Sequence, residues 1–277
     1  MARRILTLSG YLFRSLLLSV AGIIYFLLGL AFWRIFFDPG QGTPEMAYYI
    51  LVIGVFGAGI TFLVTLSVAG RAHGAANYPL LARLPSRVEH LTATLISALF
   101  FSLLVQGLLA LLALFRGPVF DLGRMAEIPP LWLSVNILAA VLALHASDLV
   151  AASWSRIAVF GSLAVLLFGQ EVTPSNIEWL TMRISRIGSW FMSTGWVGIG
   201  DLINSLGRWL QTGGAETIGA LLGLVFWPFH VISDAVIAGY FRPAQALAPA
   251  VILLYATLLF MLAADLFATK DLYLVEH

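Results

Sequence analysis

Long apolar segments separated by short polar ones dominate the chain, and a membrane-spanning helix needs about 20 predominantly apolar residues. Such segments run from Ser15 to Phe37, between Glu45 and Arg71, between His90 and Arg116, and between Arg242 and Asp265. The stretch from Ile128 to Gln170 is long enough for two helices joined by a hairpin near Asp148–Arg156. We therefore predict an all-α integral membrane fold with about six transmembrane helices, in a single transmembrane domain over residues 1–277.

The run from Thr217 to Ser233 fits this scheme less well. It is slightly short for a span, and Pro228 removes a helical hydrogen bond near its end. We prefer a re-entrant element before the last span, because irregular backbone at membrane depth is tolerated only where protein buries it. A seventh span is the alternative, and it would place the two termini on opposite sides. The residues singled out in this extracytosolic element are Trp227, Pro228, Phe229, His230 and Asp234.

Two polar stretches are amphipathic, because their apolar residues recur at helical spacing. In residues 1–14 these are Ile5, Leu8, Tyr11 and Leu12, and in Glu171–Gly214 they include Ile177, Leu180, Ile184, Ile187, Phe191, Ile199, Leu202, Ile203 and Leu206. The first stretch predicts an interfacial helix. The second predicts two helices that either lie in the membrane interface or pack as ordinary surface helices. With the re-entrant element, they form an extracytosolic cap over residues 171–240.

Arginine in short loops sets the predicted orientation, because such loops stay on the cytoplasmic side. The arginines concerned are Arg3, Arg4 and Arg14 near the N-terminus, and Arg71, Arg83 and Arg87 after the second span. With six spans, both termini and the loop over residues 71–90 are cytoplasmic in a plasma (inner) membrane protein.

The loop over residues 71–90 is predicted to contain a stiff helix. Pro79 suits the first turn of a short helix that ends before Pro85. Ser86 caps the next helix, and Glu89 three residues later completes a capping box. Because that helix continues into the third span, the loop is suited to docking a partner and transmitting motion.

The run from Tyr78 to Leu91, placed between the second and third spans, resembles the coupling-helix region of ABC-2 type permeases, the membrane subunits of ATP-binding-cassette exporters. One apolar residue of the usual run is missing between Pro85 and Ser86. Trp227–Asp234 and the charged tail Ala268–Tyr273 are also similar to elements of this family. The cap is larger than such permeases usually carry.

The resemblance implies a permease that couples ATP hydrolysis by a separate ABC ATPase subunit to substrate export. A second permease chain, identical or related, completes the dimer, and ATP and magnesium bind the ATPase. The residues that the resemblance assigns to ATPase coupling are Tyr78, Pro79, Leu81, Arg83, Leu84, Pro85, Ser86, Arg87 and Glu89.

Composition supports a membrane protein that does no chemistry itself. Of 277 residues, 60% are hydrophobic and 10% charged, with a net charge of +1, which excludes a cytosolic enzyme, a nucleic-acid binder and a disordered chain. Absent cysteine excludes thiolate metal sites. The only lysine, Lys270, follows Thr269, so the chain has no Walker A motif. We expect no catalytic residue, no metal site, no cofactor in this chain, and membrane lipid as a partner.

Polar residues inside the spans have two interpretations each. Gln106 and Asn136 either join helices by hydrogen bonds or line a translocation path. His145, Asp148 and Arg156 form either a salt-bridged hairpin or a proton relay. The main alternative to an exporter subunit is a non-transporting membrane scaffold or anchor of a larger complex. A secondary transporter ranks lower, because we find no repeat and no midplane carboxylate.

Overall fold

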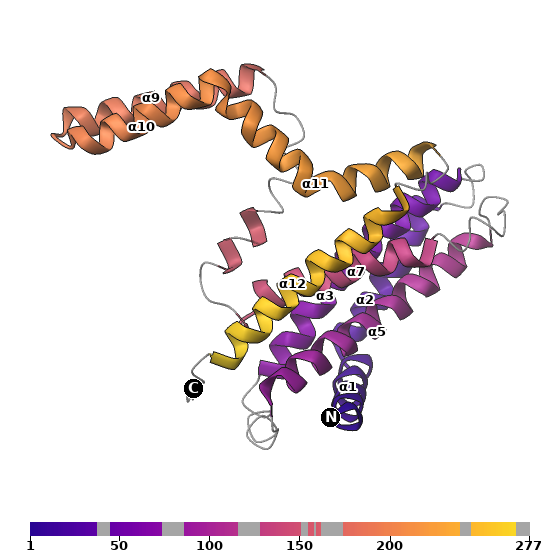
Figure 1. The fold of residues 1–277 in the computed structure, drawn as a ribbon. Coiled ribbons are helices and arrows are strands. Elements are labelled where there is room, and N and C mark those ends of the chain that lie inside the picture. The colour runs from indigo at the N-terminus through magenta and orange to yellow at the C-terminus, as the bar shows by residue number, and fades with distance from the viewer. Residues whose placement is uncertain are drawn as a thin grey trace. The chain divides into compact units, whose positions relative to one another are not determined.

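The computed structural model describes residues 1–37, 45–73, 86–115, 128–150, 155–157, 159–161, 174–238 and 245–269. Within these ranges the chain is helical, with no strand (Figure 1). The predicted all-α class is therefore confirmed. Contacts divide the chain into two compact units, which we describe separately: Met1–Phe160 with Pro228–His277, and Gly161–Trp227.

Four segments of the first unit are long and apolar enough to cross a membrane. They are α3 (Met46–His73), α5 (Arg87–Leu114), α7 (Ile128–Ala146) and Gln245–Thr269, which comprises the short η3 (Gln245–Leu247) and α12 (Ala248–Thr269). These correspond to the predicted second, third, fourth and last spans. Most of the further span expected before Gln170 lies outside the described residues.

The predicted first span differs from expectation, because it is divided by a sharp bend. Helix α1 (Ala2–Leu17) and helix α2 (Val20–Phe36) meet at 70°, and only as one broken span do they raise the number of candidates to five. Ser19 caps α2, its Oγ accepting from the Gly22 amide at 3.2 Å. A Cβ on Gly22 would lie 2.3 Å from the Leu16 carbonyl oxygen, so the bend requires glycine there.

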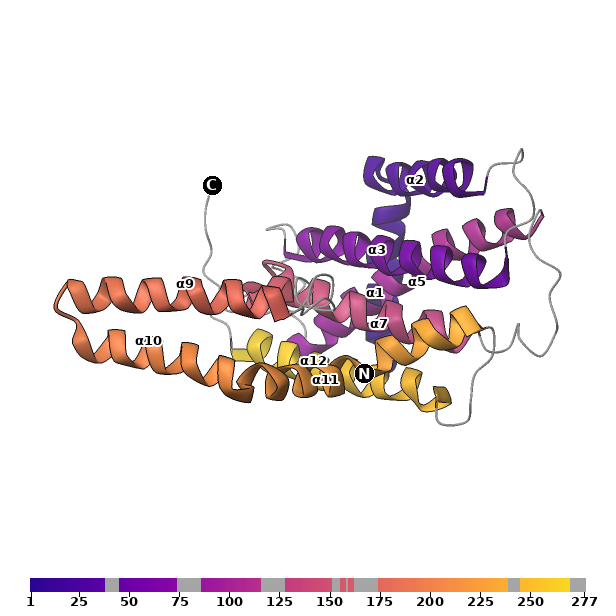
Figure 2. The same cartoon turned by 90° about the horizontal axis from the view of Figure 1, so that it is seen from above.

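The helices of the first unit pack along much of their length (Figures 1 and 2). Helix α5 is central, since it contacts α1, α2, α3, α7 and α12. Its Phe101 is fully buried and meets the rings of Phe13, Tyr25 and Phe26 at 5.6–6.1 Å. Such edge-to-face contacts hold α1 and α2 against α5.

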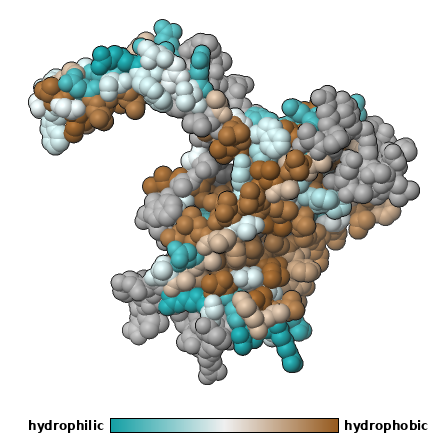
Figure 3. All heavy atoms as spheres, viewed as in Figure 1, coloured by the Kyte–Doolittle hydropathy of each residue, from teal (hydrophilic) through white to brown (hydrophobic). Residues whose placement is uncertain are grey.

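The outer surface of this unit is apolar. Large hydrophobic side chains that are more than half exposed include Val55, Phe100, Leu111, Leu258 and Met261. Figure 3 shows a face rich in hydrophobic residues, with hydrophilic residues gathered at the end where α1 lies. Soluble monomers rarely expose such continuous apolar surface, so these helices suggest a membrane protein.

The second unit contains the two amphipathic helices that the sequence predicts: α9 (Pro174–Ser193) and α10 (Val197–Trp209). They lie side by side as a hairpin (Figures 1 and 2). Gly195 ends α9 with a φ of 87°, while the Trp196 amide donates to the Phe191 carbonyl at 3.0 Å. This is a Schellman turn, in which glycine avoids the strain of a left-handed backbone.

Beyond the hairpin, η2 (Leu210–Gly214) contains a kink at Thr212 and Gly213, and α11 (Ala215–Ala238) follows. Pro228 lies inside α11 and does not end the helix. Because proline has no backbone N–H to donate, an interruption would be favoured there. The segment after it packs well, since Ile232 and Val236 are buried against α7 and α12. The apolar part Leu222–Ala238 is shorter than the four candidate spans.

Candidate functional site

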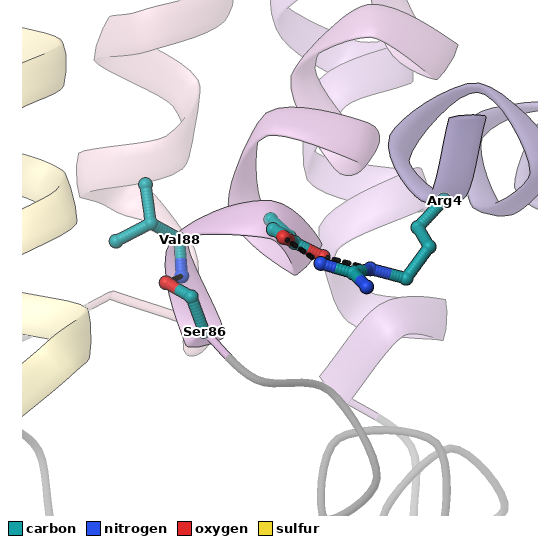
Figure 4. Close-up of polar contacts among 4 residues, drawn as sticks. Arg4, Ser86 and Val88 are labelled. Atoms are coloured by element: carbon teal, nitrogen blue, oxygen red, sulfur yellow. Dashed lines mark hydrogen bonds and ion pairs between the residues drawn. The ribbon is translucent and has the colours of Figure 1, made fainter. Parts of the chain in front are cut away.

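The beginning of α5 is the part of the predicted coupling loop that the structure describes. Ser86 precedes the helix in an extended conformation, and its Oγ accepts from the Val88 amide at 3.3 Å (Figure 4). A serine cap satisfies one of the free amides of the first turn. The predicted cap is confirmed, and α5 continues from it for 28 residues without a break.

Glu89 differs from its expected role in the capping box. Its carboxylate receives two hydrogen bonds from Arg4, from Nε at 3.1 Å and from Nη2 at 2.9 Å (Figure 4). The Glu89 side chain is 4% exposed and that of Arg4 is 53% exposed. Such a two-point contact fixes direction as well as distance, so it orients α1 on the first turn of α5.

Further contacts tie this turn to two other helices. Arg87 Nη1 donates to the Ala268 carbonyl at 3.3 Å, near the end of α12. The fully buried His90 contacts the Ala72 carbonyl through Nε2 at 3.3 Å and stacks on Phe267 at 6.4 Å. The start of α5 is therefore a junction of α1, α3, α5 and α12, which we call the α5 junction.

The remaining predicted coupling residues lie outside the described part of the chain. These are Tyr78, Pro79, Leu81, Arg83, Leu84 and Pro85. Because Ser86 follows them directly, the α5 junction is the structure that they lead into.

Gln106 and Asn136 are brought together in the interior of the helix bundle. Asn136 Nδ2 donates to Gln106 Oε1 at 2.5 Å, and Gln106 Nε2 donates to the Ile53 carbonyl at 3.2 Å. Both side chains are at most 2% exposed. This cluster links α3, α5 and α7, as expected for amides that join membrane helices.

Two features leave the second interpretation of this amide pair open. Asn136 Oδ1 is buried and has no partner among the described residues. Gln106 also borders an apolar groove of about 710 Å³ between α5, α7 and the last span. The groove is lined by residues that include Leu103, Pro129, Leu133, Pro249 and Leu253.

His145 does not contact Asp148 as a relay would require. Its Nδ1 lies 2.8 Å from Ser155 Oγ, and its Nε2 lies 2.8 Å from the Leu259 carbonyl. Because a carbonyl only accepts, Nε2 carries a proton. Asp148 instead pairs with Arg156. The geometry favours the salt-bridged hairpin.

The residues singled out in α11 do not converge on one point. Pro228 is buried and Phe229 is half-buried, whereas Trp227, His230 and Asp234 are exposed. Among the described residues, no group of three or more His, Cys, Asp or Glu side chains is arranged to hold a metal ion.

Sequence reasoning missed the residues that complete these sites. Arg4 counted only as a basic residue near the N-terminus, and Ser9, whose Oγ donates to the Ala93 carbonyl at 3.2 Å, was not considered. Gly57 was missed as well, although a Cβ there would lie 2.1 Å from Gln106 Nε2. The only signal in the sequence was the glycine itself. It was not sufficient, because α3 contains several glycines and only packing distinguishes them.

Comparison of the chain with protein-family models, curated proteins and solved structures gave no match. The function of the chain is therefore inferred from its own residues.

Proposed function

We propose that this chain is the permease subunit of an ABC exporter, located in the plasma (inner) membrane with both termini in the cytoplasm. The observation that carries the proposal is the α5 junction. The segment that resembles a coupling helix leads directly into a capped helix, whose first turn is bonded to α1, α3 and α12.

In this mechanism, ATP binding closes two ATPase subunits that contact residues 79–84 of two permease chains. The displacement reaches Ser86 and then α5, which moves as one unit because its hydrogen-bond ladder is continuous. The contacts of Arg87 and Glu89 pass the movement to α12 and α1. ATP binding can shift the permease between two conformations only if the ATPase binds these conformations with different affinity.

ATP and its magnesium ion belong to the partner in this proposal, because the sequence has no Walker A motif. Substrate passage involves the region of Gln106 and Asn136, where Gln106 borders an apolar groove and Asn136 is hydrogen-bonded to Gln106. An apolar or amphipathic cargo suits such a lining.

A membrane scaffold is the second candidate, and one observation favours it. Gln106 and Asn136 use most of their hydrogen-bonding groups to join helices, as residues of a static bundle would.

Purification of the tagged chain from its native membrane tests the proposal. We expect a P-loop ATPase to copurify, and the double variant Arg83→Ala, Leu84→Ala to lose it. The control Arg34→Ala, Ile35→Ala replaces a similar pair at the end of α2 and should retain it. A stable complex with no ATPase would support the scaffold instead. Full transport by the Arg83→Ala, Leu84→Ala variant would overturn the role of these residues in coupling.

A further inference from the structure

The α9–α10 hairpin of the second unit carries an exposed apolar face. Its members lie at helical spacing on the two helices, and each is more than 40% exposed. They are Trp179, Leu180, Ile187 and Trp190 on α9, and Ile199, Leu202, Leu206 and Trp209 on α10. We call this set the hairpin apolar face.

This face is not the contact surface between the two helices. That surface is built from small residues, since Cβ atoms on Gly188 and Gly200 would lie 2.4 Å from Asn204 Oδ1 and Met192 Cγ. Thr181 is buried there at 1% exposure. The hairpin therefore closes without the hairpin apolar face, which remains available to another surface.

Most of the other exposed residues on the hairpin are polar, with Met182 and Val197 as exceptions. Arg186 and Ser189 on α9, and Asp201, Ser205 and Arg208 on α10, are all exposed. In Figure 3 hydrophobic residues line one side of the hairpin and hydrophilic residues the other. Both helices thus turn their apolar sides in one direction, as a pair lying on a flat apolar boundary requires.

An arginine stands among the apolar residues of this face on α9, as in a lipid headgroup region, because Arg183 is four residues from both Trp179 and Ile187. The Arg183 guanidinium lies over the Trp179 ring at 5.3 Å, so a cation and an aromatic ring share one position. Trp196 at the tip is 61% exposed. Tryptophan and arginine are favoured where an apolar body meets a polar boundary.

We propose that the hairpin apolar face binds the surface of a lipid bilayer, with its aromatic and aliphatic side chains at the boundary between headgroups and acyl chains. The same chain carries four candidate spans, so a bilayer is always present at high effective concentration. A protein partner or a second copy would have to displace lipid from this face. The proposal holds for an exporter subunit and for a scaffold, so its test is independent of the proposed function.

Site-directed spin labelling of the full-length chain tests the proposal, and the absence of cysteine allows single labels. The labelled positions are Ile187→Cys and Leu202→Cys on the face. The controls are Ser189→Cys and Arg208→Cys, which are exposed and lie about 160° and about 120° around their helices from the first pair. The chain is reconstituted in vesicles of phosphatidylethanolamine and phosphatidylglycerol. Collision rates with oxygen, which concentrates in lipid, and with a water-soluble nickel chelate are then compared.

We expect the labels at 187 and 202 to favour oxygen over nickel, and the labels at 189 and 208 to show the reverse ratio. Equal nickel access at all four positions would overturn the proposal, because the face would then be in water. Protection of 187 and 202 from both reagents would also overturn it, since protein and not lipid would cover them. Spin–spin broadening between copies would identify that protein as a second chain.

Discussion

Contact between α3 and α5 depends on a residue with no side chain. Gly57 leaves the space that Gln106 fills, and Gln106 then reaches both the Ile53 carbonyl and Asn136. A hydrogen bond between membrane helices contributes about 1 kcal/mol, so this arrangement is a modest but directional link among three helices.

We expect Gly57→Ala to destabilise the folded chain by about 1–3 kcal/mol, because a methyl group there overlaps the Gln106 amide. The matched control is Gly59→Ala on the same helix, where no atom lies within 4 Å of the added Cβ. Thermal unfolding in detergent compares the two. Equal stability of both variants would show that the Gly57 contact does not form.

Single removal of either amide should cost more than removal of both. Gln106→Leu or Asn136→Leu leaves a buried partner unsatisfied, at a cost of about 1–3 kcal/mol, whereas the double variant leaves no such group. A double-mutant cycle by thermal unfolding measures this coupling. Additive losses would contradict the pairing, and normal transport by a stable double variant would remove the pair from the substrate route.

Individual polar residues were only partly predictable from the sequence. The Ser86 cap follows from local chemistry, because an N-cap acts on its own first turn. The partner of Glu89 does not, since Arg4 lies 85 positions away and only the packing of α1 on α5 brings the two together. Local rules therefore predicted the helix start, while the contact that makes it a junction depends on tertiary structure.

Helices in this chain are defined by their ends as much as by their apolar content. The bend between α1 and α2 uses Ser19 as a cap and Gly22 as a close contact. The apolar pattern crosses this point without a change, so sequence reasoning extended the first span back to Ser15. Likewise Pro228 predicted an interruption, yet α11 continues through it, because side chains that follow the proline are buried against other helices.

The α9–α10 hairpin should depend on Gly200 and not on Gly198. A Cβ on Gly200 would lie 2.4 Å from Met192 Cγ and 2.8 Å from the Gly188 carbonyl oxygen, whereas one on Gly198 meets nothing within 4 Å. Gly200→Ala should therefore weaken the hairpin by about 1–3 kcal/mol, while Gly198→Ala should strengthen α10 by up to about 1 kcal/mol.

Hydrogen exchange of the amides in α10 compares these two glycine variants with the original chain. Faster exchange in Gly200→Ala and unchanged or slower exchange in Gly198→Ala are expected. Similar exchange in both would mean that the two helices do not pack through Gly200.

The whole molecule combines a helical bundle rich in exposed apolar residues with a separate amphipathic unit. Hydropathy alone predicted the four candidate spans, because burial in lipid needs only length and apolar content. The orientation depends on a few arginines in the loops. The total number of spans depends on whether α1 and α2 form one broken span and on residues that the structure does not describe. The predicted topology is therefore a proposal with a definite test.

Labelling of single cysteines by a membrane-impermeant maleimide in sealed vesicles tests this topology. Arg3→Cys and Ser86→Cys should react from the same side, and Glu45→Cys from the opposite side, because α3 crosses the membrane between Glu45 and the loop. Reaction of Glu45→Cys and Ser86→Cys from one side would contradict α3 as a span. An Arg3→Cys label on the side of Glu45 would reverse the placement of α1.

Contact between residues 79–84 and an ATP-hydrolysing partner decides between an exporter subunit and a scaffold. A photo-crosslinking amino acid at position 83 or 84, activated in native membranes, captures whatever touches this segment, and mass spectrometry identifies it. We predict a covalent adduct with a polypeptide that contains a Walker A motif, which increases when ATP is trapped on the complex. Adducts only with proteins that bind no nucleotide would contradict the exporter proposal.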